Sequence, residues 1–329
     1  MLQEILTVGF FTAFLSAAVR LAMPLMYGGL GEMIAERAGI LNIGMEGVML
    51  SGAFFSFAGA WYFHSIPMGL LCGMLGGMVV SLLHGLLTIR LAKDQSVSGL
   101  ALNMLMLGVT SFLYKLVSSG QSYQQVETLP SLPIPGLSQI PVLGEGLFNH
   151  NVLVYLGVVI ALVMWWYLNR TNPGLRLRAV GENPGAADSV GVNILLYKYV
   201  HLILGSGIMG LGGFYMALNM GGSFEGSNCW INGYGWIAIA LVIFANWNPL
   251  YAILGTLVFG FFNTLQIYSG SLAGAFPDAL GWLNSIPSHL FKALPFLITA
   301  IVLVVTSIRK REGSGQPAAL GLNYFREER

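Results

Sequence analysis

Long apolar segments recur along the whole chain, and they limit the folds that it can adopt. A helix needs about 20 consecutive, mostly apolar residues to cross a membrane. We expect one helix from each of the following segments: 5–27, 44–63, 66–91, 99–119, 151–169, 199–220, 233–247, 249–270 and 288–308. The pattern predicts an all-α fold, a polytopic bundle of transmembrane helices with about nine spans, within a range of about eight to ten.

Two parts of this pattern indicate short or broken helices. The segment 233–247 is short for a full span, so we expect half of a broken helix there. The stretch 271–287 contains Phe276, Pro277 and Trp282, and we expect a short helix at the membrane interface.

The composition supports a membrane protein and excludes other classes. Charged residues make up 9% of the chain and hydrophobic residues 55%, with a mean hydropathy of +0.72. Soluble domains carry about 25% charged residues, which cover a surface that faces water. So few charged residues cannot cover a water-facing surface, and the expected surrounding is a lipid bilayer. The formal net charge is only +1, so no nucleic-acid partner is expected.

Lysine and arginine in short loops predict the orientation, because such residues are enriched on the cytoplasmic side of a membrane. Basic residues mark the turn at 90–93, the loop 171–198 and the stretch after residue 308 as cytoplasmic. The loops 120–151 and 221–232 contain no lysine or arginine, and we expect them outside. The C-terminus is then cytoplasmic.

We expect a single transmembrane domain over residues 1–312, with the loop 171–198 as its cytoplasmic element. Residues 313–329 form a short, polar C-terminal tail, which we expect to be cytoplasmic and flexible. The N-terminus is outside if residues 28–43 only turn, and inside if they re-enter the membrane.

Polar residues inside apolar segments are the first candidates for a transport path, because a bilayer penalises unpaired polar groups. The candidates are Asn42, Glu46, Asn103, Asn219 and Asn246. The alternative is that each asparagine bonds a neighbouring helix and only holds the bundle together. For Glu46 the alternative is a helix cap, since a carboxylate in the first turn interacts favourably with the helix dipole.

The sequence contains no pattern typical of a catalytic or metal site. The histidines and the two cysteines show no ligand spacing, and no phosphate-binding loop of the G-x-x-x-x-G-K-[ST] type occurs. We therefore expect neither enzymatic activity nor a bound cofactor. Ion coupling is disfavoured, because Glu46 and Arg20 are the only ionisable residues expected inside the bundle.

The loop 171–198 has the features of a small docking element. Asn183 followed by Pro184 is typical of a helix start, small residues come next, and Gly191 is suited to end the helix. A helix of one or two turns has no core of its own. We therefore expect it to dock into a groove of another protein, and the alternative is a plain connector between two spans.

Four stretches together carry a resemblance to a known family. They are ERAGILNIGMEGVMLSGAFF (36–55), DQSVSGLALNMLMLGVTSFL (94–113), GLRLRAVGENPGAADSVGVNI (174–194) and GYGWIAIALVIFANWNPLYAILGTLVFG (233–260). They resemble permease subunits of bacterial ABC importers of the ribose-type and branched-chain-amino-acid-type superfamily. The resemblance is greatest to the subgroup for uptake of nucleosides and simple sugars.

This resemblance implies a multi-pass subunit of the bacterial inner membrane that forms the path for a small polar solute. The implied partners are a cytoplasmic ATPase subunit that uses ATP, a second permease subunit, homologous or identical, and an extracytoplasmic substrate-binding protein or lipoprotein. The residues implied in coupling to the ATPase are Arg176, Arg178, Gly181, Glu182, Asn183, Pro184, Ala186 and Ala187. The alternative is a stand-alone secondary transporter or channel, whose gene would not lie beside that of an ATPase.

Overall fold

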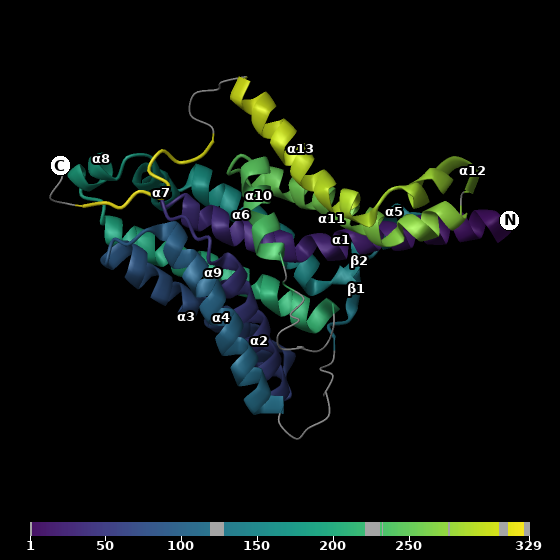
Figure 1. The fold of residues 1–329 in the computed structure, drawn as a ribbon, viewed down its shortest axis with the longest axis horizontal. Coiled ribbons are helices and arrows are strands. Elements are labelled where there is room, and N and C mark those ends of the chain that lie inside the picture. Colours follow the sequence, from purple (N-terminus) through teal and green to yellow (C-terminus); the bar gives the residue numbers. More distant parts are fainter. Residues whose placement is uncertain are drawn as a thin grey trace.

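A bundle of long helices makes up most of the computed structural model (Figure 1), which describes residues 2–118, 128–220, 231, 233–275, 277–308 and 315–325. The long helices are α1 (Leu2–Glu36), α2 (Met45–Phe63), α3 (Ile66–Gly85), α4 (Gln95–Ser118), α6 (Val152–Arg170), α9 (Ile194–Phe214), α11 (Pro249–Ala275) and α13 (Ser288–Ile308). The helices α3 and α9 each continue into a π-helical turn, Leu86–Arg90 and Tyr215–Met220.

Each of the predicted apolar segments is helical, which confirms an all-helical, polytopic bundle. Six described helices are long and apolar enough to cross a membrane: Gly9–Glu36, Ile66–Arg90, Gln95–Ser118, Val152–Arg170, Ile194–Leu218 and Pro249–Gly274. The helix α10 (Tyr234–Phe244) has only 11 residues, as expected for half of a broken helix. The total of about nine spans stays a prediction.

Glycines allow the central helices to approach closely. The run GSGIMGLGG at 205–213 predicts such packing on α9, and the structure confirms it. A Cβ atom added to Gly52 of α2 would lie 2.6 Å from the Cα atom of Gly210, and one added to Gly73 of α3 would lie 3.0 Å from the carbonyl oxygen of Gly52. The helices α2, α3 and α9 therefore pack backbone against backbone, and a larger side chain would separate them.

Two short strands lie outside the bundle. Strand β1 (Ser131–Pro133) pairs antiparallel with β2 (Asn149–Asn151), with Leu132 opposite His150. Between them, α5 (Leu143–Phe148) packs on the N-terminal half of α1, where a Cβ atom at Gly146 would lie 2.7 Å from a methyl carbon of Leu15. This small element places the segment before α6 beside the first half of α1.

The stretch 271–287 contains short helices after the end of α11, as the sequence predicts. These are α12 (Pro277–Leu280) and a 3-10 turn over Gly281–Ser285. Their location at a membrane interface stays a prediction.

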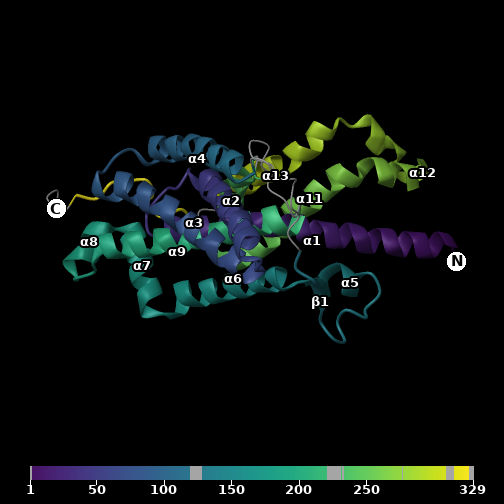
Figure 2. The same ribbon diagram turned by 90° about the horizontal axis from the view of Figure 1, so that it is seen from below.

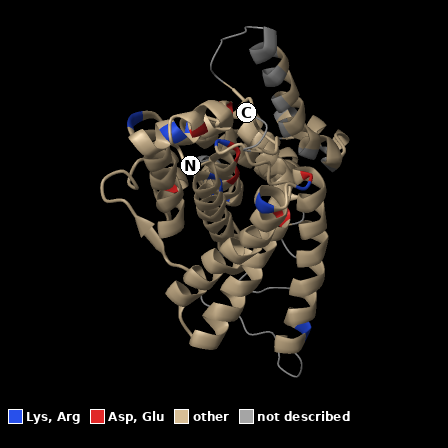
Figure 3. Cartoon of the chain, turned by 90° about the vertical axis from the view of Figure 1, so that its left-hand side faces the viewer, with Lys and Arg blue, Asp and Glu red and all other residues tan. Residues whose placement is uncertain are grey.

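The two ends of the bundle are clearly distinct. The helices α7 (Asn172–Glu182) and α8 (Pro184–Ser189) lie at one end together with the described part of the tail, and the N-terminus lies at the other (Figures 1 and 2). Residues 28–36 continue α1 as one helix, so they do not form a separate re-entrant segment. Figure 3 looks onto the α7–α8 end and shows few charged residues on a largely uncharged bundle.

Candidate functional site

The loop 171–198, which we call the α7–α8 loop, folds as two short helices. The side-chain oxygen of Asn183 accepts a hydrogen bond from the backbone N–H of Ala186 at 2.9 Å, and Pro184 is the first residue of α8. Gly191 follows with φ of +84°, a conformation that suits glycine. The predicted start and stop of α8 are therefore confirmed.

The preceding helix α7 was not predicted. Its start carries the same kind of signal, because the hydroxyl oxygen of Thr171 accepts a hydrogen bond from the N–H of Gly174 at 3.2 Å and Pro173 lies in the first turn. The sequence Thr-Asn-Pro could have revealed this helix.

The coupling residues proposed from the resemblance fall into two groups. Exposed or half-buried side chains belong to Arg176, Arg178, Glu182, Asn183, Pro184 and Ala186. By contrast, Gly181 is buried and Ala187 is only 2% exposed, in a small apolar cluster with Val180, Val192 and Ile194. The helix α8 contributes Ala187 to this cluster, which it shares with α7 and α9, and a partner would contact the first group only.

The α7–α8 loop is joined to the end of α1. Gly181 faces the backbone carbonyl of Arg37, and a Cβ atom there would collide with it. Arg37 donates a hydrogen bond from Nη2 to the carbonyl oxygen of Trp247 at 2.9 Å. Burial lowers the pKa of the Arg37 guanidinium, and the favourable charge interaction with Glu182 opposes this shift. Arg37 thus connects α1, the turn after α10 and the α7–α8 loop.

A buried polar cluster lies at the turn between α1 and α2. The backbone N–H of Asn42 donates to Oε1 of Glu32 at 2.9 Å, and the indole N–H of Trp247 donates to Oε2 of Glu36. Asn42 itself is fully buried, and its amide nitrogen lies 3.9 Å from the sulfur of Met209. The side chain of Asn42 therefore faces other protein groups.

Buried ionisable residues that the sequence did not predict include Glu32, which is 0% exposed, Glu36 at 2% and Lys198 at 5%. His84 lies within the predicted span 66–91 and is also 0% exposed, whereas Arg20 is exposed. The expectation that only Glu46 and Arg20 would lie inside the bundle is therefore wrong, and with it the argument from ionisable residues against ion coupling. Glu32 and Glu36 are one helical turn apart at the end of an apolar helix, and this spacing could have indicated a pair of buried carboxylates.

Glu46 caps a helix, but not the one that contains it. Its Oε1 atom accepts a hydrogen bond from the N–H of Gly233 at 2.7 Å, and its Oε2 atom accepts one from the N–H of Gly235 at 2.8 Å. Both donors lie at the N-terminus of α10, whose dipole favours a negative charge. A Cβ atom at Gly235 would lie 2.6 Å from Oε2 of Glu46, so glycine permits this close contact.

The side chain of Asn103 in α4 forms hydrogen bonds with the backbone at the start of α2. Its Oδ1 atom accepts a hydrogen bond from the N–H of Gly47 at 2.8 Å, and its Nδ2 atom donates to the carbonyl oxygen of Ile43 at 3.0 Å. Both polar atoms of the amide therefore have backbone partners. This arrangement is the one expected if Asn103 holds helices together.

The five candidate path residues are only partly brought together. Asn42, Glu46 and Asn103 meet around the start of α2. Asn246 lies beyond the other end of α10, in a turn with φ of +49°. Asn219 lies in the π-helical turn after α9, and its side chain is outside the described part of the structure.

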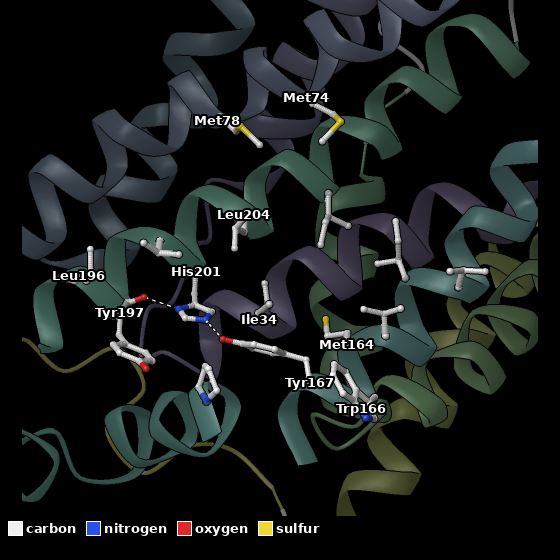
Figure 4. Close-up of a pocket in the computed structure, with 16 residues that line it drawn as sticks. Ile34, Met74, Met78, Met164, Trp166, Tyr167, Leu196, Tyr197, His201 and Leu204 are labelled. Carbon is white, nitrogen blue, oxygen red and sulfur yellow. Dashed lines mark hydrogen bonds between the residues drawn. The ribbon is translucent and has the colours of Figure 1, made fainter. Parts of the chain in front are cut away.

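An apolar groove of about 600 Å³ runs between α6 and α9 (Figure 4). Its lining includes Met74, Met164 and Trp166. His201 is one of its few polar residues, and both ring nitrogens are engaged, with the Tyr167 hydroxyl at 2.8 Å and the Tyr197 carbonyl oxygen at 2.7 Å. Such a lining does not suit a strongly polar solute, so we do not assign this groove to the transport path.

Metal binding has no support in the described ranges. Among these residues, no group of three or more His, Cys, Asp or Glu side chains is arranged to hold a metal ion.

Comparison with known proteins identifies the family of this chain. Residues 14–305 match the family described as "Branched-chain amino acid transport system / permease component". The chain belongs to this permease family. It is thus a multi-pass membrane protein and a transport component.

Individual relatives extend the comparison over nearly the whole permease. It is 35% identical to the nucleoside ABC transporter permease protein NupC of Lactococcus lactis, over 93% of this chain and 94% of the relative. It is 36% identical to the guanosine ABC transporter permease protein NupQ of Bacillus subtilis, over 94% and 95%. It is also 36% identical to the putative glucose ABC transporter permease protein TsgC13 of Haloferax volcanii, over 97% and 99%. No solved structure matches this permease.

Proposed function

We propose that this chain is the permease subunit of an ATP-driven importer and forms the path for nucleosides or simple sugars. The observation that carries the proposal is the similarity over more than nine-tenths of the chain to permeases named for nucleosides and guanosine. The relative named for glucose supports simple sugars as the second substrate class. A stand-alone transporter or channel is disfavoured by membership of the family.

The ATP-hydrolysing subunit is a separate protein that docks on the exposed side of the α7–α8 loop. Support comes from its place at one end of the bundle and from the exposed polar residues Glu182 and Asn183. ATP binds to that partner, and this chain binds no cofactor. Import further requires an extracytoplasmic substrate-binding protein or lipoprotein.

The second permease subunit is homologous to this chain and not identical to it. Three organisms each contain two of the relatives: this chain is 35–36% identical to NupC, NupQ and TsgC13 but only 22–26% identical to NupB, NupP and TsgB13. This division supports a pair of two different permeases, of which the present chain resembles the first kind.

Uptake by the reconstituted complex tests the proposal. The permease pair, its ATPase and its binding protein are placed in liposomes, and labelled guanosine, uridine and glucose are supplied outside. We expect uptake of a nucleoside or the sugar only when ATP is present at the ATPase. Uptake by this chain alone, without ATPase or ATP, would contradict the proposal.

A further inference from the structure

The C-terminal tail is attached to the α7–α8 loop at three points, although the sequence predicts a flexible tail. The N–H of Ala319 donates to the carbonyl oxygen of Gly181 at 2.9 Å, and the N–H of Ala318 donates to Oε2 of Glu182 at 3.2 Å. Further along, the Tyr324 hydroxyl donates to Oδ2 of Asp188 at 2.8 Å. The expectation of a flexible tail is therefore wrong for residues 315–325.

The same segment also contacts the turn between α1 and α2. The N–H of Gly321 donates to the carbonyl oxygen of Gly39 at 3.3 Å. Gly39 has φ of +79°, and a Cβ atom there would lie 3.2 Å from the carbonyl oxygen of Ala319. Ala319 is only 6% exposed, and Leu320 packs against the main apolar core. The middle of the tail is thus seated between two parts of the bundle.

The tail also contacts a third region, the turn between α3 and α4. The Nδ2 atom of Asn323 donates to the carbonyl oxygen of Ala92 at 2.6 Å, and its Oδ1 atom lies 3.5 Å from Nε2 of Gln95. Gln95 is 4% exposed, and its Oε1 atom accepts from the N–H of Leu41 at 2.7 Å. Gln95 therefore joins the tail to the residue that precedes Asn42.

Three of these contacts, joined by the peptide bond between Asn323 and Tyr324, connect the α7–α8 loop with the turn between α1 and α2. The connection begins at Asp188 in α8, passes through the adjacent residues Tyr324 and Asn323, and reaches Leu41 through Gln95. A rigid shift of α8 would move Tyr324, and Asn323 would follow because it is the next residue. Contiguous hydrogen-bonded elements of this kind are one physical means of coupling distant sites.

We propose that Asn323 and Tyr324 are positioning residues that transmit movement of the α7–α8 loop to the turn between α1 and α2. This inference rests on the proposed function, because it requires an ATPase acting on that loop. The tail then contributes to the number of solute molecules imported for each ATP hydrolysed, without contacting solute or ATP.

The test measures uptake and ATP hydrolysis in the same reconstituted complex. Tyr324→Phe removes a single oxygen, and Asn323→Ala removes the side-chain contacts with the carbonyl oxygens of Ala92 and Lys93 and with Gln95. The control is Leu322→Ala, because Leu322 belongs to the same segment but is 61% exposed. We expect the ratio of uptake to hydrolysis to fall at least fivefold in both variants, and to stay at the wild-type value in the control.

Two outcomes overturn the inference. The first is wild-type uptake and wild-type hydrolysis in both variants. The second is an equal fall in uptake and hydrolysis, which leaves the ratio unchanged and, together with a lower melting temperature, would show a purely structural role. The proposed function has its own failure, since it requires ATP-driven uptake by the wild-type complex. If the wild-type complex shows ATP-driven uptake and both variants behave like it, the inference about the tail fails and the proposed function stands.

Discussion

A carboxylate in an apolar segment requires partners, and Glu46 finds them in a distant helix. Each unpaired polar group in an apolar setting costs free energy, and a charged one costs more. Glu46 accepts hydrogen bonds from the N–H groups of Gly233 and Gly235, two of the donors that a helix start leaves without partners. The same contact thus satisfies the carboxylate and the exposed end of the broken helix α10.

We predict that Glu46→Ala lowers the free energy of unfolding by about 3 kcal/mol or more, because it removes two hydrogen bonds to a charged group and each contributes about 1.5–3 kcal/mol. Glu46→Gln keeps one acceptor oxygen and should lie between wild type and Glu46→Ala. Thermal unfolding of the purified protein in detergent measures both. Equal melting temperatures for wild type and Glu46→Ala would show that the cap does not stabilise α10.

Asn103 allows the two interpretations of a buried amide to be separated. Its partners are the N–H of Gly47 and the carbonyl oxygen of Ile43, so we predict that Asn103→Ala lowers the melting temperature, with a loss of about 1 kcal/mol. The control is Met104→Ala on the same helix, because Met104 is 76% exposed and should leave stability unchanged. If Asn103 lines the path instead, Asn103→Ala changes uptake at normal stability, and Asn103→Leu blocks uptake more strongly.

The sequence could predict the residue contacts that are local and not those that are distant. Asn183 caps the helix that begins at the next residue, so its role follows from a short pattern. Glu46 lies 187 residues from Gly233, and nothing near Glu46 in the chain indicates that partner. Its place in a first turn indicated a cap, but the helix that it caps became clear only from the fold.

At the scale of elements, α8 presents two neighbouring alanines in opposite environments. Ala186 is exposed, whereas Ala187 is 2% exposed in the cluster with Val180, Val192 and Ile194. A bulky residue at Ala187 would therefore disturb the loop itself, and not only its contact with a partner. Of these two positions, 186 is the one that can report on docking.

We predict opposite effects for Ala186→Leu and Ala187→Leu. Ala186→Leu should leave the melting temperature unchanged, because exposed substitutions stay within about 0.5 kcal/mol, and should lower uptake at least fivefold in the complete complex. Ala187→Leu should lower stability by about 1–3 kcal/mol through overpacking. Normal uptake by Ala186→Leu would place the docking surface elsewhere.

The tail shows why one element could not be predicted. Its polar, glycine-containing sequence is typical of a free end. Its backbone partners are carbonyl oxygens of Gly39, Gly181 and Ala92, which lie in the turn after α1, in the last turn of α7 and between α3 and α4. Backbone carbonyls of distant residues leave no mark in the sequence of the segment that they bind, so the attachment is visible only in the folded chain.

For the whole molecule, the apolar pattern predicted where the helices lie, but it predicted less completely which of them cross the membrane. Length and hydropathy determine whether a helix can span a membrane, and six described helices meet both conditions. The helix α10 does not, since it begins inside the bundle at the Glu46 contact. Short helices of this kind depend on partners inside the protein. The apolar pattern revealed α10 as a short segment, but not the contact with Glu46 at its start.

We predict the orientation of the molecule from the length of α6 and the charges at its end. This helix has 19 residues, a length of about 28 Å, close to the apolar thickness of a bilayer, about 30 Å. The segments at its two ends, β1–β2 and α7–α8, must therefore face opposite sides. Because Arg170 and Arg176 lie at the α7 end, we predict that α7, α8 and the attached tail are cytoplasmic.

Single cysteines test this orientation in a background with Cys72→Ala and Cys229→Ala. Ser131→Cys lies in exposed strand β1, Ser189→Cys at the exposed end of α8, and Leu322→Cys in the tail. An impermeant thiol reagent should label Ser131→Cys in intact cells, and the other two only after permeabilisation. A bound ATPase could shield Ser189→Cys from the reagent. Leu322→Cys controls for this, because it lies in another segment on the same side. Labelling of both Ser189→Cys and Leu322→Cys in intact cells, with none at Ser131→Cys, would invert the orientation and place the docking loop outside the reach of any cytoplasmic ATPase.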